Sequence, residues 1–214
     1  VFNVNGNHFS NFHNISASHN KARGNGGFAI INLQDGMINV TDANFISNEA
    51  DAGGRGGVFY IGAKSNIILN ATICDLNFAQ SGGGDIWIDD EAVVKVQNTK
   101  FTNSGGAFGG SLHLEGNTHL SLINSSIYQG KAFNGGSIYM SKNSQIECTN
   151  CSISFSLART GGGIFMTDYS SFTVIQSSMS HCEAEEYGGG VAAQGSSNIK
   201  FLSSKLFQNV AGLS

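Results

Sequence analysis

Two kinds of side chain in this sequence could do chemistry: a pair of cysteines and a group of carboxylates. Cys148 and Cys151 form a Cys-x-x-Cys motif, a spacing used by redox centres and zinc sites. A thioredoxin-like centre needs a βαβ context and a zinc site needs two more ligands at suitable spacing, and neither accompanies this pair. Three interpretations remain: small buried side chains, a disulfide between Cys148 and Cys151, and a metal site.

The densest acidic group consists of Asp85, Asp89, Asp90 and Glu91. Polysaccharide-cleaving enzymes gather aspartates on one face, and glycosidases place two carboxyl groups about 5 to 9.5 Å apart. The chain repeats with a period of about 27 residues, described below, and no Lys or Arg stands in the first apolar segment of the repeats. We therefore expect a solvated turn, with a calcium site and a catalytic site as alternatives, and we assign no catalytic, cofactor-binding or metal-binding residue.

The composition limits the class of protein. Among 214 residues there are 29 Gly and no Pro, which suits a chain of paired strands and many turns. Only 12% of residues are charged and the net charge is −4, so a basic surface for nucleic acid is not expected. No apolar run reaches the roughly 20 residues that a membrane-spanning helix requires.

A repeat sets the positions of these residues. Gly-Gly pairs precede an apolar segment at successive spacings of 30, 27, 26, 26, 27 and 27 residues. The pairs are Gly26-Gly27, Gly56-Gly57, Gly83-Gly84, Gly109-Gly110, Gly135-Gly136, Gly162-Gly163 and Gly189-Gly190. Val1 begins at the same phase one coil earlier, so the chain contains about eight coils of 26 to 30 residues.

Each coil carries three short apolar segments. The first two alternate with period two, as half-buried strands do. The third has one apolar anchor per coil, at Ile15, Phe45, Ile73, Phe101, Ile127, Ile153, Met179 and Leu206. These features predict an all-β, right-handed parallel β-helix with three strands per coil, since parallel crossovers are right-handed by default. Residues 1–214 would form one segment, cut from a longer solenoid whose adjacent coils are its partners.

The repeat resembles the polymorphic outer-membrane protein repeats of chlamydiae, which also occur as β-helix repeats in some protists. That family is marked by GGAI-like and FxxN motifs. Here the first appears as GGFAI, GGVFY, GGSIY and GGGIF, and the second is clearest from Phe45 to Asn48. The resemblance implies a surface-exposed or secreted protein with an adhesive role.

A polar ladder is expected in the second turn of the coil. Asn70, Asn98, Asn124 and Asn150 lie three residues before successive third-strand anchors. Stacked Asn side chains can hydrogen-bond along the axis, and Asn tolerates a left-handed turn. We expect this ladder to be buried, which would prevent glycosylation of Asn70, Asn124 and Asn150. Asn14 and Asn39 then remain the better sequons for a glycan.

A row of outward side chains is the best candidate for contact with a partner. It contains Ile30, Tyr60, Trp87, His113, Tyr139 and Met166, each the third residue after a Gly pair. In-register stacking places them about 4.8 Å apart. Such a row could bind a glycan, pack against a protein or a second solenoid, or only stabilise the sheet.

The preferred interpretation is therefore a non-enzymatic, extracellular or surface-displayed β-helix with a structural or adhesive role. The alternative is a polysaccharide lyase or glycoside hydrolase of the same fold. Carboxylates from neighbouring coils that converge in a groove with a basic residue would favour the enzyme.

Overall fold

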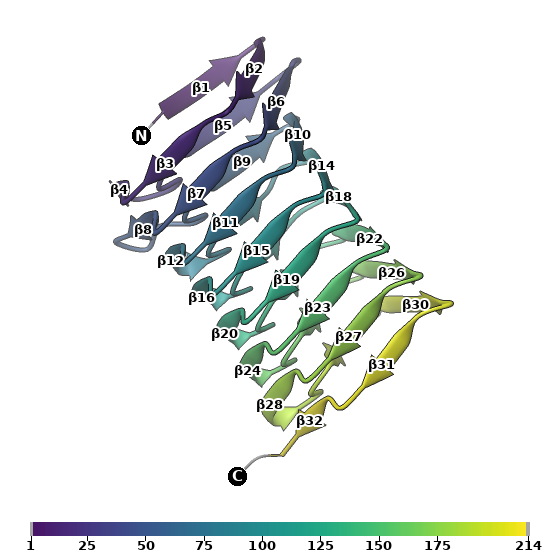
Figure 1. Cartoon of the computed structure of the whole chain (residues 1–214). Coiled ribbons are helices and arrows are strands. Elements are labelled where there is room, and N and C mark those ends of the chain that lie inside the picture. The colour runs from purple at the N-terminus through teal and green to yellow at the C-terminus, as the bar shows by residue number, and fades with distance from the viewer. Residues whose placement is uncertain (1, 213–214) are drawn as a thin grey trace.

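The computed structural model describes residues 2–212, which form a parallel β-helix of eight coils (Figure 1). The coils stack in sequence order, from the N-terminal coil at one end of the rod to the C-terminal coil at the other (Figure 1). The strands form four sheets of eight strands, in which every strand pairs in parallel with its counterpart one coil away. Residues 2–212 contain no helix, and so none that is long and apolar enough to cross a membrane.

The first sheet contains β1 (Phe2–Gly6), β5 (Ala29–Leu33), β9 (Phe59–Ala63), β13 (Ile86–Ile88), β17 (Leu112–Leu114), β21 (Ile138–Met140), β25 (Ile164–Met166) and β29 (Val191–Ala193). The second contains β2 (Phe9–His13), β6 (Met37–Thr41), β10 (Asn66–Asn70), β14 (Val93–Gln97), β18 (His119–Ile123), β22 (Gln145–Thr149), β26 (Ser171–Ile175) and β30 (Asn198–Leu202). The third contains β3 (Ser16–Ser18), β7 (Asn44–Ile46), β11 (Ile73–Asp75), β15 (Lys100–Thr102), β19 (Ser126–Tyr128), β23 (Ser152–Ser154), β27 (Ser178–Ser180) and β31 (Lys205–Phe207).

The fourth sheet corrects the prediction of three strands per coil. Its members are β4 (Lys21–Arg23), β8 (Glu49–Asp51), β12 (Phe78–Gly82), β16 (Gly105–Phe108), β20 (Lys131–Asn134), β24 (Leu157–Thr160), β28 (Glu183–Tyr187) and β32 (Val210–Ala211). The inward residue of these strands is Ala in seven coils and Gly106 in the other. Such small side chains give almost no hydrophobic contrast, so the sequence pattern misses the strand.

The core lies inside the coils and is built from side chains that occupy equivalent positions in successive coils. In β10, for example, Ile67 and Leu69 are buried and lie beside Val94 and Val96 of β14. The alternation of apolar and polar residues in this sheet follows from the period of two between side chains on one face. Each coil therefore buries its apolar residues against those of the next coil, and the core is continuous along the rod.

The predicted positions are wrong in two places: two of the third-strand anchors and two of the Gly pairs. Ala17 and Cys74, not Ile15 and Ile73, align with Phe45 in the third sheet, and Ile73 is an exposed neighbour of Asn44. A β-branched residue at the first, outward position of β11 gave the misleading signal.

The Gly pairs of the sixth and seventh repeats also begin one residue earlier, at Gly161 and Gly188. Gly161 has φ of 66°, and a Cβ there would lie 2.3 Å from the carbonyl oxygen of Ile164. Only glycine satisfies both conditions without strain.

Candidate functional site

The strands of the first sheet pair in the register that the predicted outward row requires, but the last predicted residue of the row does not belong to it. Trp87 pairs with Tyr60 and His113, and Tyr139 pairs with Phe165. Met166 instead aligns with Met140 and is fully buried in the core. Its assignment to the row is wrong because the Gly pair of that coil starts at Gly161.

The aromatic rings of the row form a continuous stack along the rod. The ring centroids of Trp87 and His113 are 3.4 Å apart with an interplanar angle of 12°, and those of His113 and Tyr139 are 4.7 Å apart at 29°. Tyr139 and Phe165 follow at 5.5 Å and 8°. The Trp87 and His113 rings lie nearly face to face, whereas the two longer pairs have the centroid separation of offset stacking, which adds about 0.5–1.5 kcal/mol per pair beyond the burial of area.

The centre of the row is covered, so the prediction that Trp87 and His113 offer an open contact surface is wrong. Trp87 is 4% exposed and His113 is 3% exposed. The guanidinium carbon of Arg55 lies 4.5 Å above the Trp87 ring, and the Phe108 ring lies 5.2 Å from that of Tyr139. Arg55 comes from the turn before β9 and Phe108 from the end of β16, so both reach the row from the fourth-sheet side of the coil. Only Ile30, Tyr60 and Tyr139 keep partial exposure among the predicted outward residues.

His113 is neutral in this environment. Burial lowers the pKa of its imidazole to about 3. Its Nδ1 lies 3.4 Å from the carbonyl oxygen of Phe108, which can only accept, so Nδ1 carries the proton and Nε2 is left with a lone pair. Nε2 lies 3.9 Å from a carboxylate oxygen of Glu115, and this contact is therefore not an ion pair.

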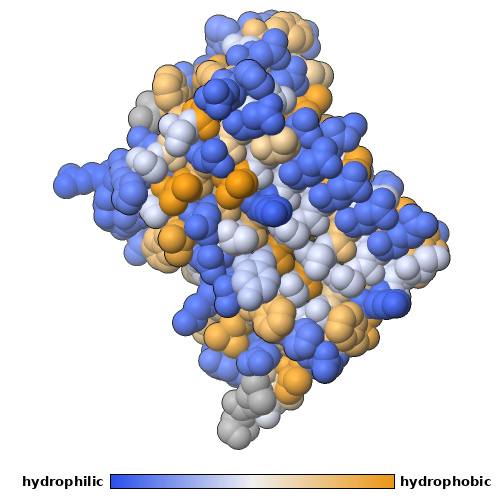
Figure 2. All heavy atoms as spheres, in the orientation of Figure 1, coloured by the Kyte–Doolittle hydropathy of each residue, from blue (hydrophilic) through white to orange (hydrophobic). Residues whose placement is uncertain are grey.

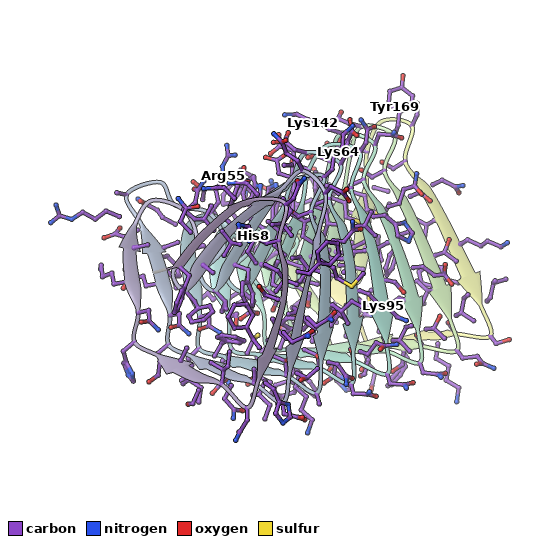
Figure 3. All side chains as sticks on the ribbon, turned by 90° about the horizontal axis from the view of Figure 1, so that it is seen from above. His8, Arg55, Lys64, Lys95, Lys142 and Tyr169 are labelled. Carbon is purple, nitrogen blue, oxygen red and sulfur yellow. The ribbon has the colours of Figure 1, made fainter. Side chains whose placement is uncertain are left out.

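Carboxylates of neighbouring coils do converge beside this row. Asp89 and Glu115 directly follow Ile88 and Leu114, which pair across β13 and β17. Each carboxylate has a cationic partner: Arg55 Nη1 lies 3.5 Å from Asp89 Oδ2, and Lys142 bonds to Glu115. Figure 3 shows Arg55, Lys64 and Lys142 on the same side of the rod.

The Asp89 carboxylate lies in surroundings that favour its protonated form. Burial, and then the nearby charge of Asp90, raise the pKa of Asp89 above its usual range. The Tyr60 hydroxyl donates to Asp89 Oδ2 at 3.5 Å. Within residues 2–212 no set of three or more His, Cys, Asp or Glu side chains is arranged to hold a metal ion. Asp85, counted with this acidic group from the sequence, is buried inside the coil instead.

The predicted Asn row lies on the outside of the rod. The Nδ2 group of Asn98 donates to Asn70 Oδ1 at 2.9 Å, and Asn150 donates in the same way to Asn124 at 3.3 Å. Asn124 and Asn98 are 3.5 Å apart at the corresponding atoms. Asn98, Asn124 and Asn150 are exposed and have positive φ, so the expected burial is wrong. In the third coil the left-handed residue is Ala71, one position after Asn70.

A buried amide ladder does exist, one turn further along the coil. Asn20 Nδ2 donates to Asn48 Oδ1 at 2.8 Å, and Asn48 Nδ2 donates to Asn77 Oδ1 at 3.1 Å. Asn77 Nδ2 then donates to Asp85 Oδ1 at 2.9 Å, and Ser104 Oγ donates to the same atom at 2.8 Å. Asn48 is the Asn of the FxxN motif, so the motif itself was the signal for this ladder.

The fold changes which of the Asn-x-Ser/Thr residues are good candidates for a glycan. Asn14 is exposed in the same left-handed turn as Asp42 and Asn98, so it lies on the ladder phase and not off it. Asn39 lies within β6, is half-buried, and donates to Asn11 Oδ1 at 2.7 Å. Burial therefore gives no reason to prefer Asn39 to Asn124 or Asn150.

All four cysteines are free and buried, so the disulfide between Cys148 and Cys151 does not form. Cys148 faces the core from β22, and Cys151 follows the left-handed residue Asn150 and also points inward. The hydrogen bond with Cys151, and then burial, raise the pKa of the Cys148 thiol, whereas the same bond lowers the pKa of Cys151. Burial raises the pKa of Cys74 and Cys182, which lie outside the motif. The motif acts as core packing.

These features define a parallel β-helix with a covered aromatic stack and two amide ladders. Residues 110–214, just under half of the chain, match a protein-family model described as a right handed beta helix region, and the chain is similar to that family over this range. The match agrees with the right-handed β-helix that the repeat predicts. No curated protein and no solved structure matches the chain.

Proposed function

We propose that the chain is a non-enzymatic β-helix that is secreted or displayed on a cell surface, where it has a structural or adhesive role. The observation that carries this proposal is the pairing of the two stacked carboxylates. Asp89 and Glu115 are each neutralised by a cation, Arg55 and Lys142 respectively. A general acid or base must be free to exchange a proton with substrate, and paired carboxylates beside a covered aromatic row lack that freedom.

The surface supports display outside the cell. Asn14 stands in an exposed turn and in an Asn-x-Ser sequon, where a glycan could be attached. The resemblance to the chlamydial GGAI/FxxN repeats points to the same compartment. The continuous core and the hydrogen-bonded ladders give a stiff rod, which suits a scaffold that holds a contact surface away from a cell.

The second candidate, a polysaccharide-cleaving enzyme, is favoured by one observation. Asp89 and Glu115 come from adjacent coils, about 4.8 Å apart along the rod, with two basic side chains beside them. That spacing is near the separation of the carboxyl groups in retaining glycosidases. The raised pKa of Asp89 also resembles that of a general acid.

One experiment separates the two functions. The purified protein is incubated with a panel of acidic and neutral polysaccharides, and new reducing ends and unsaturated products are measured alongside retention on the same immobilised polymers. We expect retention or self-association without cleavage. Cleavage that disappears in the Asp89→Asn, Glu115→Gln double variant would overturn the non-enzymatic assignment. Antibody labelling of intact source cells tests the location, and labelling only after permeabilisation would contradict it.

A further inference from the structure

A shallow groove of about 500 Å³ follows the turns between the second and third sheets over the fifth to eighth coils. On the face shown in Figure 2, a band of hydrophilic side chains follows the side of the rod where Figure 1 places the turns between β14 and β15 and between β18 and β19. One wall of the groove is a row of amides, Asn124, Asn150 and Gln176, and the other is a row of hydroxyls, Ser126, Ser152 and Ser178. The groove is therefore polar on both sides.

The two walls repeat in register with the coils. Ser126 pairs with Ser152, and Ser152 pairs with Ser178 across the third sheet. The residues of the amide wall share a left-handed conformation, with φ of 49°, 53° and 50° in chain order. The fifth, sixth and seventh coils thus each present one amide and one hydroxyl, at a repeat of about 4.8 Å along the axis.

The groove offers hydrogen-bonding groups that the protein does not use. In residues 2–212 the hydroxyls of Ser126, Ser152 and Ser178 make no hydrogen bond, although all three are partly exposed. The Oδ1 atom of Asn150 and the amide of Gln176 have no side-chain partner among the same residues. A ligand that replaces the water on these groups must carry both donors and acceptors at each repeat.

The charges and side-chain types around the groove argue against a nucleic acid or a protein as its ligand. The positions that flank the three serines in the same column are Lys100 and Lys205, and no charged side chain lies between them. A nucleic acid requires a run of cations along its phosphates, and two separate lysines do not supply one. The residues that dominate binding between proteins are enriched in desolvated aromatic and Arg side chains, and the walls contain neither.

We propose that this groove binds a neutral, extended polysaccharide that lies along the rod axis with one sugar residue against each coil. The proposal rests on the adhesive function above and names the class of its ligand. A sugar residue in an extended glycan is about as long as one coil is high, and its hydroxyls both donate and accept. The fifth, sixth and seventh coils make the same contacts, so affinity rises with the number of sugars until the groove is filled.

The test measures binding of fluorescently labelled cellohexaose, chitohexaose and laminarihexaose, with an oligogalacturonate as the acidic comparison, by anisotropy. The protein is produced in a host that adds no glycan, so that Asn124 and Asn150 stay free. We expect at least one neutral hexamer to bind more tightly than its dimer. The Ser126→Val, Ser152→Val variant is expected to bind about tenfold more weakly, from the loss of two hydrogen bonds.

Ser16→Val is the matched control, because Ser16 occupies the same column in the first coil, outside the groove. Valine suits an outward strand position, and thermal unfolding confirms that each variant folds. Unchanged affinity in the double variant, equal loss in Ser16→Val, binding of the acidic oligomer alone, or no neutral binding at all would overturn the groove as the site. Retention of the protein on immobilised polysaccharides, in the experiment proposed above for the function, would then leave the adhesive function standing without this groove.

Discussion

Replacing Asp85 by Asn should stabilise the protein at alkaline pH. Asp85 is fully buried, and its Oδ1 accepts hydrogen bonds from Asn77 and Ser104. Its Oδ2 atom and the hydroxyl of Ser111 are buried without a hydrogen-bond partner. An Asn side chain keeps the Oδ1 acceptor and places an NH₂ group at the other position, where it can donate to Ser111.

The magnitude follows from the pKa of the carboxyl group. Burial raises the pKa of Asp85 from 3.8 to about 7, so folding favours the protonated form. The unfolded chain ionises near pH 4, and the folded state therefore binds an extra proton between about pH 4 and pH 7. Stability from this group is present below pH 4, falls as the pH rises to 7, and is then lower by about 4 kcal/mol.

The assay is denaturant unfolding of wild type and Asp85→Asn at pH 5 and pH 8. We expect the variant to gain on the order of 2 to 4 kcal/mol over wild type at pH 8 and distinctly less at pH 5. Asp51→Asn serves as the control, since the backbone N–H of Ala52, and then Lys21, lower the pKa of the Asp51 carboxyl, and its removal should give no such gain. A variant that is equally destabilised at both pH values would refute the reasoning, because Asp85 would then be stabilised as a carboxylate.

The other predictions concern the packing. Gly161→Ala should destabilise the protein by more than about 1 kcal/mol, because Gly161 has a positive φ and a Cβ there would clash with Ile164. Gly105→Ala is the control and should be neutral, since its Cβ would meet only atoms 3.6 Å away. Equal losses of stability in thermal melts of the two variants would contradict this. Trp87→Ala should lower stability by about 3 kcal/mol, and the native Trp87 fluorescence should resist quenching by acrylamide. Ready quenching would mean that the row is open. All four thiols should react with a thiol reagent only after unfolding, and a count below four after unfolding without reductant would reveal a disulfide.

The architecture could be predicted because coils repeat the same period-two pattern in phase. The apolar residues of β10 and β14 contrast strongly with their neighbours, and their inward positions follow directly. The fourth strand could not be found in this way, since its inward residue is Ala or Gly. In β11 the predicted inward residue is one position too early, because Cys74 points inward and the more apolar Ile73 points outward.

The candidate site was less predictable for a different reason. The alternation places Trp87 and His113 in one outward row, but it does not say what lies above that row. Arg55 and Phe108 cover it from the segments that directly precede β9 and β17, and their side chains follow no period. The Asn row was found from its spacing, yet the side on which it lies depends on the left-handed conformation of Asn98, Asn124 and Asn150.

The stacking of strands also determines how this rod responds to force. Because the hydrogen bonds between coils run along the axis, tension between the two ends opens one coil at a time at the end of the stack and does not shear all coils together. A released coil of about 27 residues extends to about 90 Å, whereas in the rod it occupies about 4.8 Å. A tether of this kind lengthens in steps of about 85 Å and dissipates work at each step.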